Sequence, residues 1–346
     1  MSQKRRYTLT VLEKIEETDD SCTIKFKQPG LKKINYQPGQ FITLILNING
    51  RIYQRPYSVS SVFGIDQTID ITVKAIENGV VSNYIKSTLN IGHSIEIIEP
   101  LGTFILPTVP SSTIMLWAAG SGISPIFAIL KQLLNNTNTE VILNYSSRNI
   151  NQVILLSEIE KLHEKFSSKF QCNLFLSQVT FLNDKKFKCQ QKLKESNVNE
   201  MILKNNINKD VLHYICGPNQ YNIFVQNSLA ANGIKTENIK IEDFNQILDA
   251  EDLRDINDTW VKINVGTEEH SFFVKKGESI LNAALDMGIN IDYSCQTGTC
   301  ELCFGNILEG ELKMITHHKK EIKIKGESCL LCCSLPLTNN LKISVN

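Results

Sequence analysis

Short runs of alternating apolar and polar residues fill the chain up to about Pro107. Proline and glycine separate these runs, as in Pro29-Gly30 and Pro38-Gly39. Strands that recur at short intervals between such turns are typical of a small antiparallel barrel. The pattern predicts one helix over Ser82–Thr88 and strands over Tyr7–Glu13, Cys22–Phe26, Phe41–Leu46, Tyr53–Ser60, Ile69–Val73 and Ile95–Ile98.

The pattern changes between Thr113 and Phe244, where apolar runs of strand length alternate with helical ones. The predicted strands are Ile114–Ala118, Val141–Tyr145, Asn173–Leu176, Leu212–Cys216 and Ile239–Ile241. The predicted helices are Ile123–Leu134, Leu156–Phe166, Val198–Lys204 and Tyr221–Asn232. Alternation of this kind predicts an α/β domain, with a parallel sheet covered on both faces.

An acidic stretch over 246–258 follows, in which five Asp or Glu residues accompany the single Arg254 and no apolar periodicity is visible. Such a stretch predicts a domain boundary. Beyond it, the pattern predicts a hairpin over Val261–Val265 and Ser271–Lys275, a helix over Ser279–Met287 and a closing strand near Leu341–Val345. The chain of 346 residues is therefore divided into domains at 1–108, 109–245 and 259–346, with 246–258 as linker.

Composition and charge narrow the functional classes. The formal net charge is zero, so no overall field attracts nucleic acid or a membrane surface. The segment Val109–Leu130 contains no charged residue, but Gly120, Gly122 and Pro125 argue against a membrane-spanning helix and favour a buried strand, turn and helix. Because the N-terminus also lacks a signal-peptide pattern, we expect a soluble, cytoplasmic protein.

Six of the ten cysteines lie in the segment from Cys295 to Cys333. A reducing compartment disfavours a disulfide framework, so this density points to metal ligands. Cys295, Cys300 and Cys303 have the C-x4-C-x2-C spacing of plant-type [2Fe–2S] ferredoxins, and Gly298 allows close approach of the loop. Structural zinc is the alternative, but zinc sites usually combine two C-x2-C pairs.

Spacing alone leaves Cys329, Cys332 and Cys333 as candidates for the fourth ligand. The segment resembles ferredoxin-like chains, which place that cysteine in a G-x-x-L-x-C-x-x-x-P context. This resemblance implies Cys332, four residues before Pro336, and it implies an α+β domain of the β-grasp type. His317-His318, directly followed by lysines, is interpreted as a solvated loop rather than a metal site.

The first 245 residues resemble the ferredoxin–NADP⁺ reductase superfamily. Arg55-Pro56-Tyr57-Ser58 matches its flavin-binding R-x-Y-S, Gly79-Val80-Val81-Ser82 its G-x-x-S, and Gly102-Thr103-Phe104 its G-x-F. The resemblance implies that Arg55 pairs with the flavin phosphate, that Tyr57 stacks on the isoalloxazine and that Ser58 hydrogen-bonds near N5. It places the start of the helix and Ser82 against the pyrophosphate, and it adds Val73 and Lys74 as flavin contacts.

A glycine-rich turn follows the first strand of the α/β domain. It reads Gly120-Ser121-Gly122-Ile123-Ser124-Pro125, and such a turn lets a dinucleotide pyrophosphate approach helix N–H groups. By the same resemblance, Cys216-Gly217-Pro218 matches a C-G-P whose sulfur lies near the nicotinamide. Glu242-Asp243-Phe244 matches the terminal E-x-F, with Glu242 orienting the nicotinamide or flavin edge. Ser147 and Arg148 suit a ribose 2′-phosphate, which favours NADPH over NADH, although a solvated arginine also fits.

A nicotinamide donates two electrons as a hydride, whereas a [2Fe–2S] cluster accepts single electrons, so a flavin between them is required. The order of the three domains resembles the reductase components of multicomponent oxygenases. The segments VKAIENGVVSNYI, AAGSGISPI, YSSRN and LLCCSLPLTNN most resemble the reductases of phenylacetyl-CoA epoxidases. The resemblance implies FAD, with FMN as the alternative, and an oxygenase or another redox protein as electron acceptor.

Related reductases serve other acceptors, which are ring-hydroxylating dioxygenases, alkane hydroxylases and the hybrid-cluster protein. A redox sensor that binds nucleotide without turnover is the alternative from a different class. For an electron-transfer reductase, the resemblance assigns the reactive positions to Tyr57, Ser58, Cys216 and Glu242.

Overall fold

A computed structural model of the chain describes residues 4–345 except 31, 109–110, 179–186, 206, 246–247 and 316–327. The predicted solvated loop at His317-His318 therefore lies outside the described residues. The chain forms two compact units, Met1–Glu242 and Asp243–Asn346, and each is described by itself. Among the helices of the described residues, none is both long and apolar enough to span a bilayer.

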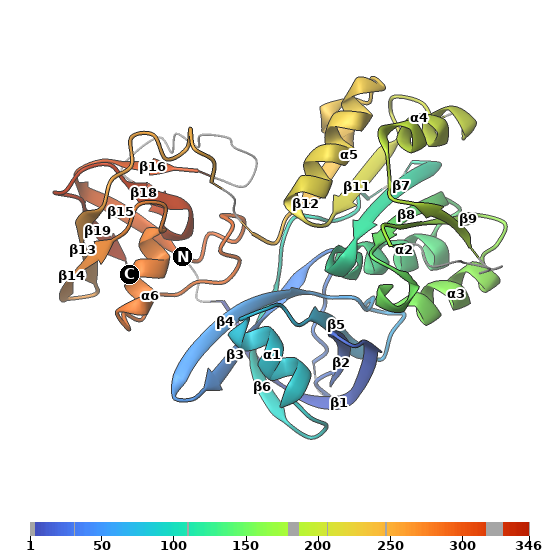
Figure 1. Cartoon of the computed structure of the whole chain (residues 1–346). Coiled ribbons are helices and arrows are strands. Elements are labelled where there is room, and N and C mark those ends of the chain that lie inside the picture. Colours follow the sequence, from blue (N-terminus) through green and yellow to red (C-terminus); the bar gives the residue numbers. More distant parts are fainter. Residues whose placement is uncertain are drawn as a thin grey trace. The chain divides into compact units, whose positions relative to one another are not determined.

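The first half of unit 1 is the expected antiparallel barrel (Figure 1). Its six strands lie in the order β4-β3-β6-β1-β2-β5, and an isolated bridge between Val59 and Ile71 joins the two edges. Alternating apolar side chains fill the interior, as in β2 and β5. The elements are β1 (Arg6–Thr18), β2 (Ser21–Lys27), β3 (Phe41–Ile48), β4 (Arg51–Ser58), β5 (Thr68–Lys74), α1 (Val80–Ser87) and β6 (Ser94–Leu101).

The second half of unit 1 is the expected parallel sheet, in the order β10-β9-β8-β7-β11-β12. One apolar cluster lies under α2 and α3 and another under α4 and α5, so helices cover both faces (Figure 1). The strands are β7 (Thr113–Ala119), β8 (Glu140–Ser147), β9 (Phe170–Leu176), β10 (Lys188–Gln191), β11 (Leu212–Cys216) and β12 (Ile239–Glu242). The helices are α2 (Ile123–Asn136), α3 (Leu156–Lys165), α4 (Glu195–Lys204) and α5 (Asn219–Ala231).

Unit 2 is a mixed five-stranded sheet in the order β14-β13-β19-β15-β17, with α6 packed on one face. A separate pair, β16 and β18, lies beside it. The elements are β13 (Thr259–Val265), β14 (Glu268–Val274), α6 (Ile280–Asp286), β15 (Phe304–Glu309), β16 (Leu312–Met314), β17 (Ser328–Leu330), β18 (Ser334–Pro336) and β19 (Lys342–Val345).

The described part of the acidic stretch, 248–258, folds as part of unit 2. Ile256 is fully buried in a small cluster that Leu248 and Leu253 also join. The Lys313 Nζ donates to the backbone oxygen of Asp252 at 2.9 Å, and Asp258 Oδ1 accepts from the Lys276 backbone N–H at 2.7 Å. Three apolar residues among the acids and these two hydrogen bonds hold the segment against the domain that follows.

Candidate functional site

The predicted flavin strand is β4, an edge strand of the barrel, where the missing N–H of Pro56 is tolerated. Arg55 and Tyr57 are half-buried, and the Arg55 guanidinium donates to the Gln54 carbonyl at 2.8 Å. Burial raises the pKa of Tyr57 above its usual value, against the opposing charge of Arg55. Tyr57 therefore remains a neutral phenol, with a ring suited to stacking.

The start of α1 is built to receive an anion. Gly79 precedes the helix, and in the described residues no side chain caps its first turn. A Cβ at Gly79 would lie 2.5 Å from both Ile76 Cγ1 and Ser82 Oγ, so glycine is required by space. Ser82 Oγ accepts the Ile76 N–H at 3.3 Å, which fixes its hydroxyl beside the helix start. Uncapped N–H groups beside a fixed hydroxyl fit a phosphate.

The glycine-rich turn joins β7 to α2 at the carboxyl edge of the parallel sheet. A Cβ at Gly122 would lie 2.1 Å from the Cys216 carbonyl oxygen, because the end of β11 passes directly against the turn. Gly120 has φ +54° and nothing within 4 Å of its missing Cβ, so the turn faces open space there. The helix start has no side-chain cap among the described residues. This fits the pyrophosphate of a dinucleotide.

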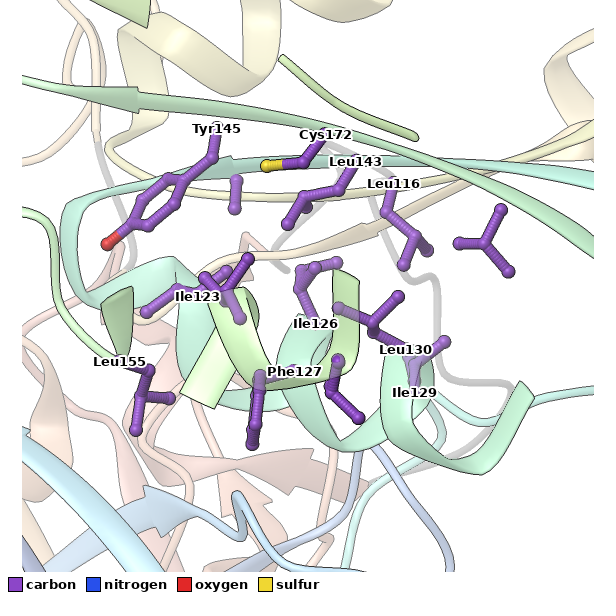
Figure 2. Close-up of a cluster of buried hydrophobic side chains, with 14 of the residues drawn as sticks. Leu116, Ile123, Ile126, Phe127, Ile129, Leu130, Leu143, Tyr145, Leu155 and Cys172 are labelled. Atoms are coloured by element: carbon purple, nitrogen blue, oxygen red, sulfur yellow. The ribbon is translucent and has the colours of Figure 1, made fainter. Parts of the chain in front are cut away.

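Two side chains fix this turn. Tyr145, at the end of β8, donates to the Gly120 carbonyl at 3.2 Å, and its hydroxyl accepts the Ile154 N–H at 3.1 Å. Ser124 donates to the Thr72 carbonyl of the barrel strand β5 at 3.2 Å. The predicted site residue Ser124 thus joins the two halves of unit 1. In Figure 2, Tyr145 on the strand layer lies above Ile123, in the first turn of α2, at the left end of the core.

The remaining predicted nicotinamide residues meet at the ends of β11 and β12. Cys216 is fully buried and pairs in register with both Ala118 and Glu242. Asn222 on α5, which the sequence did not reveal, donates to the Gly217 carbonyl at 3.1 Å and the Glu242 carbonyl at 3.3 Å. The Cys216-Gly217-Pro218 turn is therefore fixed to the end of β12.

The end of β8 carries the residues predicted to bind the ribose. Ser147 Oγ donates to the Gln152 carbonyl at 2.9 Å, which ties the end of β8 to the loop before α3. The Arg148 side chain directly after it is exposed. The position therefore offers an exposed cation at the carboxyl edge of the sheet.

Other predicted flavin and nicotinamide contacts differ in exposure. Val73 and Val81 lie in the barrel core, so only their backbone is available to a ligand. Val80 is half exposed, and Lys74 forms an ion pair with Asp20 at 3.3 Å. Phe244 is exposed at 40% and belongs to unit 2.

The cysteine loop 295–303 of unit 2 contains no helix or strand. Gln296, Gly298 and Glu301 have positive φ values of 58°, 83° and 59°. This backbone turns N–H groups toward sulfur, so that Cys295 Sγ accepts from Thr297 at 3.4 Å and from Thr299 at 3.3 Å. N–H groups directed at sulfur are what a cluster thiolate requires.

Cys332, on the short 3₁₀ turn between β17 and β18, completes the set of adjacent sulfurs. Its thiol is within hydrogen-bonding reach of Cys295 and Cys303 and lies 3.5 Å from the Cys333 sulfur, whereas Cys329 interacts with Ser334 instead. Hydrogen bonds from the Cys300 and Cys332 thiols lower the pKa of Cys295, which favours its thiolate. In the described residues, no three His, Cys, Asp or Glu side chains meet the geometry of a single metal ion. The four-sulfur donor set fits an iron–sulfur cluster.

Three families match consecutive parts of the chain. They are the oxidoreductase FAD-binding domain at residues 8–105, the oxidoreductase NAD-binding domain at 116–227 and the 2Fe-2S iron-sulfur cluster binding domain at 263–337. The chain therefore contains the FAD-binding and NAD-binding domains of an oxidoreductase, followed by a C-terminal [2Fe–2S] domain. The predicted three-domain fold and the three cofactors are confirmed.

The similar proteins are components of oxygenase systems. The chain is 28% identical to the ferredoxin reductase component of 3-ketosteroid-9-alpha-monooxygenase from Rhodococcus rhodochrous, over 98% of this chain and 97% of that one. It is also 28% identical to a component of 1,2-phenylacetyl-CoA epoxidase from Escherichia coli, over 97% of both. Phthalate dioxygenase reductase has the same fold, with a TM-score of 0.68, 19% identity and 98% of both chains covered. Electrons thus pass from NAD(P)H through FAD to [2Fe–2S], but the two 28% identities do not single out an acceptor.

Proposed function

We propose that this chain is the reductase of a multicomponent oxygenase and that its acceptor is a phenylacetyl-CoA epoxidase. The segments VKAIENGVVSNYI, AAGSGISPI and LLCCSLPLTNN support that acceptor, as does full-length similarity to the component of the Escherichia coli epoxidase. The equal identity to the ketosteroid monooxygenase reductase makes that oxygenase the comparison in any test.

The observation that carries the proposal is the junction of the two halves of unit 1. The glycine-rich turn is tied through Ser124 to Thr72, and Thr72 directly precedes Val73 and Lys74 on β5. The proposed flavin and nicotinamide sites are therefore connected by a hydrogen bond between the two halves of unit 1. A hydride donor and its acceptor need such a fixed separation, because transfer depends steeply on alignment.

In this proposal Arg55 and the start of α1 hold the flavin phosphates, and Tyr57 and Ser58 contact the ring. Tyr57 stays protonated because its burial raises its pKa, so it places no second negative charge beside a reduced ring. Cys216 and Glu242 line the nicotinamide side of the site. When bound, the flavin supplies the conversion of one hydride into two single-electron steps.

For the cluster we propose Cys295, Cys300, Cys303 and Cys332 as ligands. The loop supplies three sulfurs and the turn before β18 the fourth, with Thr297 and Thr299 donating N–H groups to Cys295. The corresponding domain division is 1–108, 109–245 and 259–346, with 246–258 between them. Fixed N–H donors stabilise thiolate charge and thereby tune a cluster potential.

For the nucleotide we propose NADPH, with Ser147 and Arg148 receiving the ribose 2′-phosphate. Arg148→Ala removes the exposed cation, so the KM for NADPH is expected to rise about tenfold while the KM for NADH changes little. Lys161→Ala, on the exposed face of the neighbouring α3, is the matched control. An equal rise in the KM for NADPH and for NADH would contradict the assignment of Arg148 to the 2′-phosphate.

The acceptor is tested with the purified oxygenase components of phenylacetyl-CoA epoxidase and 3-ketosteroid 9α-monooxygenase. Each is mixed with the chain, its own substrate and NADPH, and product is quantified against nucleotide consumed. We expect coupled product with the epoxidase only. Product with the ketosteroid oxygenase alone would assign the chain to that system. Nucleotide binding with no reduction of either component, or of cytochrome c, would indicate a redox sensor.

A further inference from the structure

Glu17 lies at an irregularity near the end of β1, where the pairing with β2 shifts register between Glu16 and Thr18. Such bulges redirect a side chain out of the regular strand alternation. The Glu17 carboxylate is directed toward the α/β half of the unit, and Oε2 accepts the Leu155 N–H at 3.1 Å, across 138 residues of sequence. Its other oxygen accepts the Thr23 hydroxyl at 2.6 Å.

Leu155 precedes α3 in a left-handed conformation, with φ 60° and ψ 25°. This conformation is unfavourable for leucine and persists only where the surroundings enforce it. Its side chain is buried among the residues under α2 (Figure 2), and its N–H is held by Glu17. The helix start therefore depends on a carboxylate supplied by the barrel.

One arm of contacts runs from Leu155 to the glycine-rich turn. The preceding Ile154 donates its N–H to the Tyr145 hydroxyl at 3.1 Å, and that hydroxyl lies 3.2 Å from the Gly120 carbonyl. The Tyr145 side chain is fully buried, so its hydroxyl is held inside the core. A shift of the 154–155 backbone is thereby passed to Gly120.

The second arm runs through buried hydroxyls of the barrel. Because Thr23 donates its proton to Glu17, the Thr72 hydroxyl is the donor in the 2.9 Å contact between Thr72 and Thr23. Thr72 Oγ1 also lies 3.1 Å from Ser60 Oγ, two residues beyond the flavin-strand Ser58. The Thr72 carbonyl accepts from Ser124 in the turn. Thr23, Thr72, Ser60 and Ser124 are all at least 95% buried.

We propose that Glu17 is a positioning residue that sets the glycine-rich turn relative to the flavin strand. Both arms start at its carboxylate and end in the Gly120–Ser124 turn, so it fixes the turn at two points. The expected effect on activity rests on the proposed hydride transfer from nicotinamide to flavin. The positioning of the turn concerns only contacts within this chain.

The first test requires no turnover. Hydrogen exchange of the amides at 120–124 and 154–155 is compared between the full chain, Glu17→Ala and Glu17→Gln. Exchange is expected to rise at both segments in Glu17→Ala. The matched control is Glu13→Gln, which removes the same charge from the same strand. Glu13 forms an ion pair with Lys25, and its side chain is 53% exposed. A rise at 154–155 without any at 120–124 would overturn the inference.

The second test separates hydride transfer from the later electron steps. In Glu17→Ala, flavin reduction by excess NADPH or NADH is expected to slow about 10- to 100-fold, the cost of a small misalignment. Flavin content, and cytochrome c reduction by the chain pre-reduced with dithionite, should match the wild type. Equal slowing of both steps, or none of either, would overturn the inference.

Two further variants keep the test decisive if Glu17→Ala does not fold. Glu17→Gln keeps one acceptor oxygen, but its amide nitrogen cannot accept the second N–H or O–H, so an intermediate effect is expected. Thr72→Val cuts only the hydroxyl arm, and Thr72→Ser should restore it. If the wild-type flavin is reduced by neither nucleotide, the proposed function fails, and the exchange data alone decide the role of Glu17.

Discussion

The glycine-rich turn of unit 1 and the cysteine loop of unit 2 are held in place by different means. The turn lies between a strand that is buried from Ile114 to Ala119 and a helix whose inner face is buried, and Tyr145 and Ser124 tie it to neighbouring backbone. The loop lies between α6 and β15 with no regular structure, and two non-glycine residues in it have positive φ. Much of its hydrogen bonding is directed at sulfur.

The contrast indicates where each site obtains its stability. Packing and backbone hydrogen bonds organise the turn before any nucleotide binds. The loop gathers thiols that repel one another as thiolates, so the metal cluster is expected to contribute to folding of that region. Substitutions at each site should therefore have different consequences.

Cys332→Ser should have the strongest effect, which is loss of the cluster. The Cys332 sulfur is the one within reach of both Cys295 and Cys303. Iron content and the broad visible absorption should fall nearly to zero, and the melting temperature of unit 2 should fall more than that of unit 1. The adjacent Cys333→Ser is the control and should retain both. The reverse result, with Cys333→Ser losing the iron, would reassign the fourth ligand.

Gly122→Ala tests whether the turn is organised by packing. The added Cβ would lie 2.1 Å from the Cys216 oxygen, so the free energy of unfolding of unit 1 should drop by about 3 kcal/mol. Gly120→Ala has open space around it and only the positive φ to oppose it, so about 1 kcal/mol is expected. Thermal melts followed by circular dichroism compare the two. An equal cost for both variants would mean that contact with β11 does not constrain the turn.

The sheet beneath α4 and α5 contains a buried histidine, which makes unit 1 sensitive to acid. Trp117 donates to His213 Nδ1 at 3.2 Å, and burial lowers the pKa of His213 from 6.5 to about 3. The unfolded chain binds this proton near pH 6.5 and the folded one does not. The contribution of His213 to the free energy of unfolding is therefore highest above pH 6.5 and falls by about 1.4 kcal/mol per pH unit as the pH is lowered from 6.5 toward 3.

Denaturant unfolding followed by tryptophan fluorescence measures that slope. Trp260→Phe leaves Trp117 as the single tryptophan of the chain, so the signal reports unit 1. In that background His213→Gln should flatten the pH dependence between 6.5 and 4. An unchanged slope would show that His213 is not the group responsible.

The weakest effect is expected at an ion pair that joins the two halves of unit 1. Lys131 on α2 lies 2.7 Å from Asp66 of the barrel, and both side chains are more than four-fifths buried. Lys131→Met should cost about 1 kcal/mol of unfolding free energy, since the stem still packs. Lys161→Met, at the exposed pair with Glu158, should have no measurable effect. If both variants lowered the free energy of unfolding equally, the Lys131–Asp66 ion pair would not hold the two halves of unit 1 together.

The sequence predicted the elements that consist of continuous apolar runs, such as β7 and β11, and the motifs that depend on local spacing, such as Cys295–Cys303. It did not predict β10 or the strands β15 to β18, which are short and carry polar or glycine residues where a strand pattern needs apolar ones. The packing of the acidic stretch was invisible for a similar reason, because its described residues contribute just three apolar side chains, Leu248, Leu253 and Ile256, to the cluster that joins it to the domain.

Residues that act over long sequence distances were also beyond prediction. Glu17 and Leu155, or Asn222 and Glu242, meet only when the fold is complete. A glutamate near a hairpin and an asparagine in a helix have no local pattern that distinguishes them from solvated residues. Such contacts became visible only in the structure.

Electron flow from NAD(P)H, through a flavin, to a [2Fe–2S] cluster unites these sites, and we propose Cys295, Cys300, Cys303 and Cys332 as the cluster ligands. The most direct test is an anaerobic spectrum of the purified chain before and after an excess of NADPH or, in a separate sample, of NADH, because full reduction of flavin and cluster takes three electrons and each nucleotide supplies two. We predict flavin bands on a broad iron–sulfur absorption, with both bleached by the nucleotide. A protein whose flavin is bleached while the cluster absorption persists, or whose spectrum neither nucleotide changes, would contradict this electron path.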